Sequence, residues 1–274
     1  MTAAATLAAF RALHAPGGGI LVLPNAWDSM SARLIEAAGA RAIATTSSGV
    51  SWSLGRRDGQ GLGREEMIAA VARIVRSVRV PVTADVEAGY GLGTPEDAAT
   101  TARAVLEAGA AGINLEDSPG RDGAALLEAV EQAERITAAR EAGGALFINA
   151  RLDVYLRGAG VESGRFAETV RRAEAYLAAG ADGIFVPGVA AGDLIGRLVA
   201  AIPAPLNVLA GPGTPDVAAL AALGVSRVSV GPKLALAMLG RVRAAAAELL
   251  ERGTYGALEG APGFGEVDGM FGGG

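Results

Sequence analysis

Hydrophobic and polar positions follow two alternating patterns along the chain of 274 residues. Short runs of β-branched and other apolar residues recur about every 20 to 35 residues, and longer segments rich in Ala, Leu and Arg with helical periodicity separate them. The short runs predict eight strands, at residues 20–24, 41–46, 81–87, 112–117, 146–152, 183–187, 205–209 and 227–231. The longer segments predict eight helices, at residues 29–38, 64–77, 95–108, 124–142, 162–179, 191–201, 215–223 and 232–251.

Turn residues support this alternation. Thr94 followed by Pro95 is typical of a helix start, because the hydroxyl can cap and proline fits the first helical position. Eight βα units in about 250 residues predict a closed (β/α)8 TIM barrel. An open doubly wound sheet is the alternative, but no Gly-x-Gly-x-x-Gly motif follows the first strand. Glycines that supply a left-handed helix stop follow four of the predicted helices, at Gly39, Gly109, Gly180 and Gly224.

Composition favours one large globular domain. The chain is 51% hydrophobic and 19% charged, which excludes a disordered protein. Its 40 glycines follow no strict repeat, which excludes a collagen-like protein. We therefore expect a single barrel domain over residues 1–252 and a Gly-rich tail of loop or disordered structure over residues 253–274.

Charge and rare residues narrow the chemistry. A net charge of −5 without a cluster of Lys or Arg argues against binding to nucleic acid or to an anionic membrane. No apolar run reaches the roughly 18 residues of a membrane span, so we expect a soluble cytoplasmic protein that binds a small molecule. The chain has no Cys and one His, so acid–base chemistry falls to carboxylates, Tyr, Arg, Lys or water.

Three carboxylates are candidates for a metal site, because active sites of barrels lie at the C-terminal ends of the strands. Asp85 and Glu87 share one face of the third predicted strand, and Glu116 points inward from the fourth. Acids brought together in a partly dry cavity raise one another's pKa values unless a cation neutralises them. Mg²⁺ suits such oxygen ligands best, with Mn²⁺ as a possible substitute. The alternative is that these acids form salt bridges with arginines of the barrel.

Polar side chains near the acids are candidates for substrate binding. Arg151 and Asn149 share one face of the fifth predicted strand. The guanidinium of Arg151 presents a fork for a carboxylate or phosphoryl group, or pairs instead with Glu116 or Glu87. The other candidates for substrate binding are Thr46, Ser47, Ser48 and Asn207.

Two further residues are candidates for catalysis. Asp58 lies in a long polar loop, 54–61, of the length expected for a site loop. Tyr90 is the nearby phenol that could donate a proton, although a Tyr in a Gly-Tyr-Gly turn can equally serve packing. Lys233, the one Lys of the chain, follows Gly-Pro at the start of the last predicted helix, which disfavours a Schiff-base role on a barrel strand.

Segments 43–58, 84–91, 115–117, 150–151 and 173–176 together resemble the isocitrate lyase/phosphoenolpyruvate mutase superfamily. The most specific piece is Asp-Val-Glu-Ala-Gly-Tyr-Gly at residues 85–91, and the order and spacing agree from about residue 23 to 250. The resemblance implies a (β/α)8 barrel and Mg²⁺ held directly by Asp85. It also implies dimers or tetramers in which the last helix is swapped onto a neighbouring subunit.

Site roles also follow from the resemblance. It implies that Glu87, Glu116 and Asp58 hold Mg²⁺ mainly through water. It further implies that the turn at residues 46–48 and Arg151 bind a 2-oxo acid whose oxygens chelate the metal. The shared chemistry of the superfamily makes or breaks a bond next to an enolate of a 2-oxo acid.

Departures from the superfamily pattern limit the activity. Its lyases carry a loop whose Cys is the acid, and this chain has no Cys. The residues after Asp117 read Ser-Pro-Gly-Arg-Asp-Gly, so the gating loop is short, and the Lys and Asn of the phosphonomutase loop are absent. Ala44 stands where mutases place a Trp.

The sequence therefore predicts a Mg²⁺-dependent carbon–carbon lyase of the isocitrate lyase or methylisocitrate lyase type, acting through an enolate on a small 2-hydroxy or 2-oxo carboxylic acid. Three alternatives remain open. They are a phosphoenolpyruvate phosphonomutase or phosphonopyruvate hydrolase, an oxaloacetate decarboxylase, and a 2-oxo acid binding protein that has lost its catalytic loop.

Overall fold

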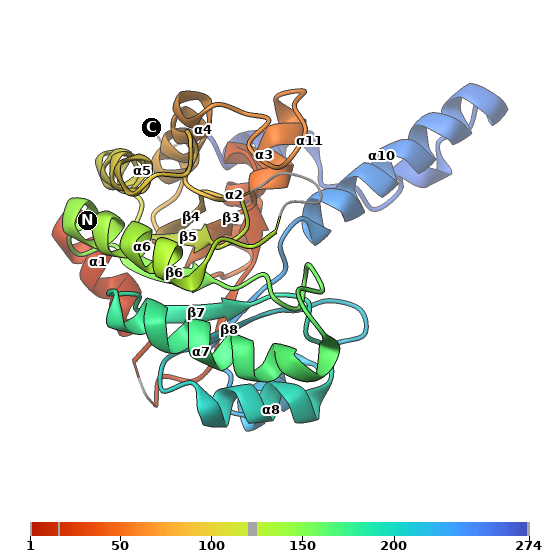
Figure 1. The fold of residues 1–274 in the computed structure, drawn as a ribbon. Helices are drawn as coiled ribbons and strands as arrows, with labels where there is room; N and C mark the ends of the chain where they lie inside the picture. Colours follow the sequence, from red (N-terminus) through yellow and green to blue (C-terminus); the bar gives the residue numbers. More distant parts are fainter. Residues whose placement is uncertain (1, 16, 120–124, 273–274) are drawn as a thin grey trace. The chain divides into compact units, whose positions relative to one another are not determined.

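The computed structural model describes residues 2–15, 17–119 and 125–272 (Figure 1). The chain falls into two compact units, residues 1–232 and 233–274. The first contains a parallel sheet with helices around it (Figure 1). Its strands are β1 (Leu21–Leu23), β2 (Asn25–Ala26), β3 (Ile43–Thr45), β4 (Val82–Asp85), β5 (Gly112–Glu116), β6 (Phe147–Arg151), β7 (Gly183–Val186), β8 (Leu206–Leu209) and β9 (Arg227–Ser229).

The sheet closes into a barrel because its two end strands, β1 and β2, follow one another in the chain. Its strand order is β1-β9-β8-β7-β6-β5-β4-β3-β2, and all neighbouring pairs are parallel. Only Pro24 separates β1 from β2, so both ends of the sheet belong to one extended segment. Proline has no N–H to donate to a ladder, which divides this segment into two short strands. The eight predicted strands and the (β/α)8 barrel are thereby confirmed.

Several helices of the first unit begin or end at the predicted turn residues. Thr94 caps α5 by accepting a hydrogen bond from the amide of Asp97 (3.2 Å), and Pro95 occupies the first turn. Gly39 and Gly109 adopt left-handed backbone (φ 93° and 85°), as the stops required. The helices are α1 (Ala3–Ala12), α2 (Ser29–Ala37), α3 (Ser47–Ser53), α4 (Arg64–Ser77), α5 (Pro95–Glu107), α6 (Ala129–Gly143), α7 (Arg165–Ala178), preceded by the 3₁₀ turn η1 (Glu162–Gly164), α8 (Gly192–Ala201) and α9 (Val217–Ala222).

Two helices of this unit were not predicted. Helix α1 packs Phe10 into a core with Leu21 and Phe147. Helix α3 forms where a turn was expected at residues 46–48. Its Ser and Gly residues have low helix propensity, but the helix is short and largely buried. Helix α6 begins at Ala129 rather than at the predicted residue 124, and residues 120–124 of the expected short loop lie outside the described residues.

The lumen of the barrel contains a buried layer of amide side chains. Asn149 of β6 donates from Nδ2 to Oδ1 of Asn114 on β5 (2.9 Å) and to Oδ1 of Asn207 on β8 (3.1 Å). Nδ2 of Asn207 lies 3.2 Å from Oγ of Ser229 on β9. The lumen of a (β/α)8 barrel is normally filled by branched apolar side chains, so these strands hold an unusually polar core.

The second unit consists of α10 (Lys233–Arg252), the 3₁₀ turn η2 (Gly256–Leu258) and α11 (Phe264–Gly269). Glu248 accepts hydrogen bonds from the amides of Gly256 (2.8 Å) and Ala257 (2.6 Å), and Arg241 donates to the carbonyl of Glu259 (2.8 Å). Residues 256–258 and 264–269 therefore form helical turns where a loop or disordered tail was expected, and the contacts of Glu248 hold the first of these turns against α10. The swap of the last helix and the domain boundary at residue 252 stay predictions.

None of the helices in the described residues is long and apolar enough to cross a membrane.

Candidate active site

Asp85 is the last residue of β4, and hydrogen bonds to the end of β3 and the start of α3 hold it in place. Its amide donates to Oγ1 of Thr45 (2.9 Å), and its Oδ2 accepts from the amide of Ser47 at the start of α3 (3.2 Å). Its Oδ1 is buried and has no hydrogen-bond partner among the described residues. One carboxylate oxygen is thus fixed by the backbone while the other is free to bind a ligand.

Glu87 follows in a left-handed backbone conformation (φ 51°), which ends the regular alternation of the strand. Its side chain is 2% exposed. The amide of Gln60 donates to Oε2, whereas Oε1 is buried without a partner in the described part of the chain. Burial, followed by the charges of Asp58 and Asp85, raises the pKa of Glu87 to about 8. The predicted acids therefore share one electrostatic environment.

Glu116, at the end of β5, pairs with Arg151 at the end of β6. Oε2 of Glu116 lies 2.6 Å from Nη1 of Arg151. Burial raises the pKa of Glu116 even though Arg151 opposes this, and Asp153 and Asp85 raise it further. The alternative in which Arg151 pairs with Glu116 is therefore present in the structure, but it leaves part of the guanidinium available.

Asp153 completes the hold on Arg151 and was not predicted. Its Oδ1 lies 2.7 Å from Nε of Arg151 and its Oδ2 lies 3.0 Å from Nη2, a bidentate pair with Asp153 fully buried. Burial alone would lower the pKa of Arg151, but Glu116 and Asp153 raise it instead. The spacing Arg-Leu-Asp after β6 was the available signal, because alternate residues share a face.

A buried network positions Asp153 in turn. Oδ1 of Asp117 accepts from the amide of Asp153 (2.9 Å). Oδ2 of Asp117 accepts from Nη1 of Arg172 (2.9 Å) and from the hydroxyl of Tyr176 (3.0 Å), both on α7. Asp117 points away from Glu116 toward this helix, as the strand alternation predicts. The loops after β5 and β6 are thus tied to α7.

The hydroxyl candidates lie at the start of α3. Oγ1 of Thr46 and Oγ of Ser48 are 3.0 Å apart, and all three residues 46–48 are buried. The side chain of Ser47 hydrogen-bonds Asp58. Although Asp58 as a residue is exposed, loss of solvation at its carboxyl group, followed by the charge of Asp85, raises its pKa. The structure brings these residues together with Asp85.

Asn149 and Asn207 lie elsewhere. Both donor hydrogens of the Asn149 amide are taken by Asn114 and Asn207, and both residues are buried within the lumen. Their role in substrate binding stays a prediction.

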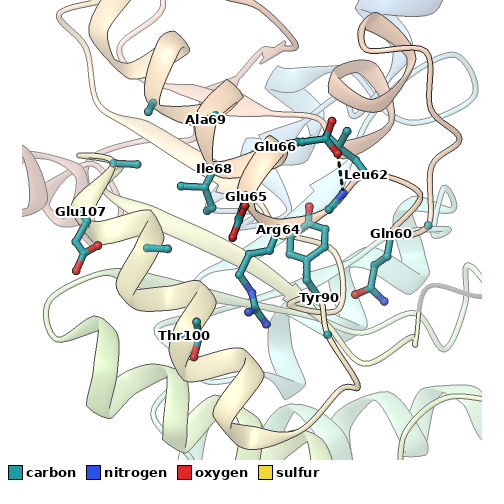
Figure 2. Close-up of a pocket in the computed structure, with 16 residues that line it drawn as sticks. Gln60, Leu62, Arg64, Glu65, Glu66, Ile68, Ala69, Tyr90, Thr100 and Glu107 are labelled. Carbon is teal, nitrogen blue, oxygen red and sulfur yellow. Dashed lines mark hydrogen bonds between the residues drawn. The ribbon is translucent and has the colours of Figure 1, made fainter.

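Tyr90 connects the acids to a neighbouring cavity. Its backbone is left-handed (φ 61°), its side chain is 3% exposed and its hydroxyl has no partner within the described ranges. Burial, then Glu87 and the other acids, raises its pKa well above the usual range. Tyr90 and Gln60 lie at one end of a cavity of about 1090 Å³ between α4 and α5, as Figure 2 shows. This cavity contains none of the predicted metal ligands.

The acids fit a cation that keeps part of its water shell. Among the described residues, no group of three acidic or His side chains converges closely enough to hold one ion. Two buried carboxylate oxygens, on Asp85 and Glu87, nevertheless lack partners in the chain as described. Mg²⁺ is commonly bound by one or two carboxylates and several waters, so this donor set suits it.

Comparison with known proteins identifies the family of the chain. The profile of the phosphoenolpyruvate phosphomutase family matches residues 10–250. The chain belongs to this family. The resemblance to the isocitrate lyase/phosphoenolpyruvate mutase superfamily is thus confirmed, and with it an enzyme of a lyase and mutase class whose substrate is open.

Relatives within the family differ in activity. A protein of Mycobacterium tuberculosis without an assigned activity is 39% identical over 223 residues, 81% of each chain. The 2-methylisocitrate lyase of Bacillus subtilis is 33% identical over 193 residues, 68% of this chain and 62% of the relative. An oxaloacetate decarboxylase of Ectopseudomonas mendocina is 34% identical over 65% of this chain and 61% of its own length. A phosphonopyruvate hydrolase solved with oxalate and Mg²⁺ has 27% identity and a TM-score of 0.86, over 99% of this chain and 95% of that one.

Proposed function

We propose that this protein is a Mg²⁺-dependent carbon–carbon lyase that acts on a small 2-hydroxy or 2-oxo carboxylic acid through an enolate. The observation that carries the proposal is the arrangement of Arg151 beside the acids. Two of its five N–H groups, on Nε and Nη2, donate to Asp153, and Nη1 forms an ion pair with Glu116 (2.6 Å), which leaves N–H groups on both Nη atoms without a further carboxylate partner in the described residues. A rigid guanidinium with two free donors suits a carboxylate.

Asp85, with Glu87, Glu116 and Asp58 through water, would hold the metal. When bound there, Mg²⁺ supplies a Lewis acid for negative charge that develops on the oxygen of a 2-oxo acid. The solved relative that contains oxalate and Mg²⁺ supports this combination of ligands.

The chain's own residues then supply binding and orientation. Arg151 binds the substrate carboxylate and offsets charge that appears in the reaction. Thr46 and Ser48 offer hydroxyl donors next to Asp85. Tyr90, whose buried hydroxyl lies near the acids and has no partner in the described residues, is the proton donor that we assign in place of the absent Cys.

Oxaloacetate decarboxylation is the second candidate on the same site. It forms an enolate but needs no Cys acid, and a relative of 34% identity bears that activity as its name. Phosphonomutase or phosphonopyruvate hydrolase activity has weaker support, because the phosphoryl-binding Lys and Asn of the mutase loop are absent from the sequence. A purely binding role is the remaining alternative, and the absent Cys and the short loop after Asp117 favour it. A homo-oligomer and a cytoplasmic location belong to the same proposal.

The test is a parallel incubation of the protein and Mg²⁺ with isocitrate, methylisocitrate, oxaloacetate and phosphonopyruvate, with products followed by proton and phosphorus NMR. We expect cleavage of one carbon substrate, and its loss in Asp85→Ala and with excess EDTA. Equal turnover by Asp85→Ala would refute the metal site. Silence with all four substrates would favour the binding role.

A further inference from the structure

An arginine side chain is buried in the lumen of the barrel without a carboxylate partner in the described residues. Arg227, the first residue of β9, is 1% exposed. Its Nη2 donates to Oδ1 of Asn114 (3.2 Å), whereas its Nε and Nη1 have no hydrogen-bond partner in the part of the chain that the structure describes. No salt bridge to a described carboxylate involves it. Burying an unpaired charge is costly, and packing alone does not explain it.

The position of this guanidinium follows from the strand register. In the sheet order, β8, β7 and β6 separate β9 from β5, so the side chain of Arg227 crosses the lumen to reach Asn114. Asn114 is the register partner of Asp85 on β4. The guanidinium of Arg227 therefore ends beside Asn114, the neighbour of Asp85. The negative charge of Asp85 favours the charged form of Arg227.

Arg227 is positively charged at neutral pH. Burial lowers its pKa to about 9 while Asp85 opposes the shift. His14, the titratable group on its other side, does not add charge, because burial and then Arg227 itself lower the pKa of His14 to about 4. Arg227 is thus one isolated positive charge between His14 and the acids.

We propose that Arg227 is a positioning residue whose positive charge, buried in the lumen, reduces the net negative charge of the active site. Resting on the proposed function, it partly offsets the acids around Asp85, so that an anionic substrate can bind among them. It acts through the electric field and through Asn114 and touches neither substrate nor metal. The same positive charge necessarily weakens binding of a cation.

The opposite effects of Arg227 on anion binding and on cation binding distinguish this proposal from a purely structural role. Removal of the charge should strengthen Mg²⁺ binding and weaken binding of an anion, whereas simple damage to the lumen should weaken both. Coupling between neighbouring sites commonly changes affinity about fivefold or more. Arg227→Met removes the charge at similar volume and leaves Oδ1 of Asn114 bonded to Asn149.

The experiment is calorimetric titration of the full-length protein, first with Mg²⁺ alone and then with oxalate at saturating Mg²⁺. We expect Arg227→Met to bind Mg²⁺ about fivefold more tightly and oxalate about fivefold more weakly than the wild type. Asn114→Asp is the second variant, because it gives Arg227 a carboxylate partner without removing it, and it should shift both affinities in the same directions. It carries the test if Arg227→Met does not fold.

Two results would overturn the inference. If the neutral variant and Asn114→Asp weaken both ligands, or change neither, Arg227 is structural only. If the wild type binds neither Mg²⁺ nor oxalate, the proposed function itself fails and the inference falls with it. The wild-type titration thus distinguishes the two failures.

Discussion

The bidentate pair between Asp153 and Arg151 gives the sharpest prediction for substitution. Asp153 is fully buried and makes two charge-assisted hydrogen bonds, at 2.7 and 3.0 Å. Asp153→Asn keeps the shape and one acceptor oxygen but removes the charge. A hydrogen bond to a charged group contributes about 1.5 to 3 kcal/mol, so we expect the free energy of unfolding to fall by about 2 to 3 kcal/mol.

Function should suffer as well, because Arg151 keeps only Glu116 to orient it. We expect KM for the substrate to rise about 10- to 100-fold, as for a misplaced binding group. Urea unfolding gives the first quantity and steady-state kinetics the second. Arg171→Gln is the matched control, since its ion pair with Glu168 is more exposed on both sides and should contribute under about 1 kcal/mol. If Asp153→Asn matched this control in both stability and KM, the assigned role of Asp153 would be wrong.

Three further predictions follow from single residues. The pKa of Glu87 in the metal-free protein is raised from 4.5 to about 8, so the stability it contributes is complete below pH 4.5 and is lost as the pH rises through 8; thermal unfolding in EDTA should show this decline, and Mg²⁺ should reverse it. Tyr90→Phe should lower kcat about 100-fold and leave the unfolding temperature unchanged, because the hydroxyl has no partner among the described residues; unchanged kcat would remove Tyr90 from the mechanism. Gly188→Ala places a methyl group 2.6 Å from the amide nitrogen of Leu156 at φ 87° and should lower the free energy of urea unfolding by more than about 2 kcal/mol. Gly213→Ala, at φ 93° with nothing within 4 Å, should lower it only by the backbone strain of about 1 kcal/mol. Equal losses of stability in the two variants would contradict the contact with Leu156.

The barrel could be predicted because each βα unit is encoded locally. Strand runs, helical periodicity and stops such as Gly39 are properties of neighbouring residues, and eight repeats leave few topologies. The acids could be predicted for a related reason, since Asp85 and Glu116 stand where strands end. At Asp85 and Glu116, the strands of the structure end close to the strand ends predicted from the local sequence.

Features that depend on distant contacts could not be predicted. Arg227 looks like an ordinary strand residue in the sequence, and only the closure of the barrel brings its guanidinium to Asn114. Asp153 follows the fifth predicted strand directly, but its role depends on the pairing of β5 with β6, which brings Asp117 to its amide. The tail was expected to be irregular because Gly is frequent there, whereas Glu248 on α10 supplies the acceptors that hold its turns.

A crystal of the protein soaked with Mn²⁺ and oxalate tests the central claim most directly, because the anomalous signal of manganese locates the ion. We expect one strong peak beside Asp85, with Glu87 and Glu116 contacting it mainly through water and with oxalate between the ion and the free N–H groups of Arg151. A peak remote from Asp85, or oxalate bound away from Arg151, would contradict it.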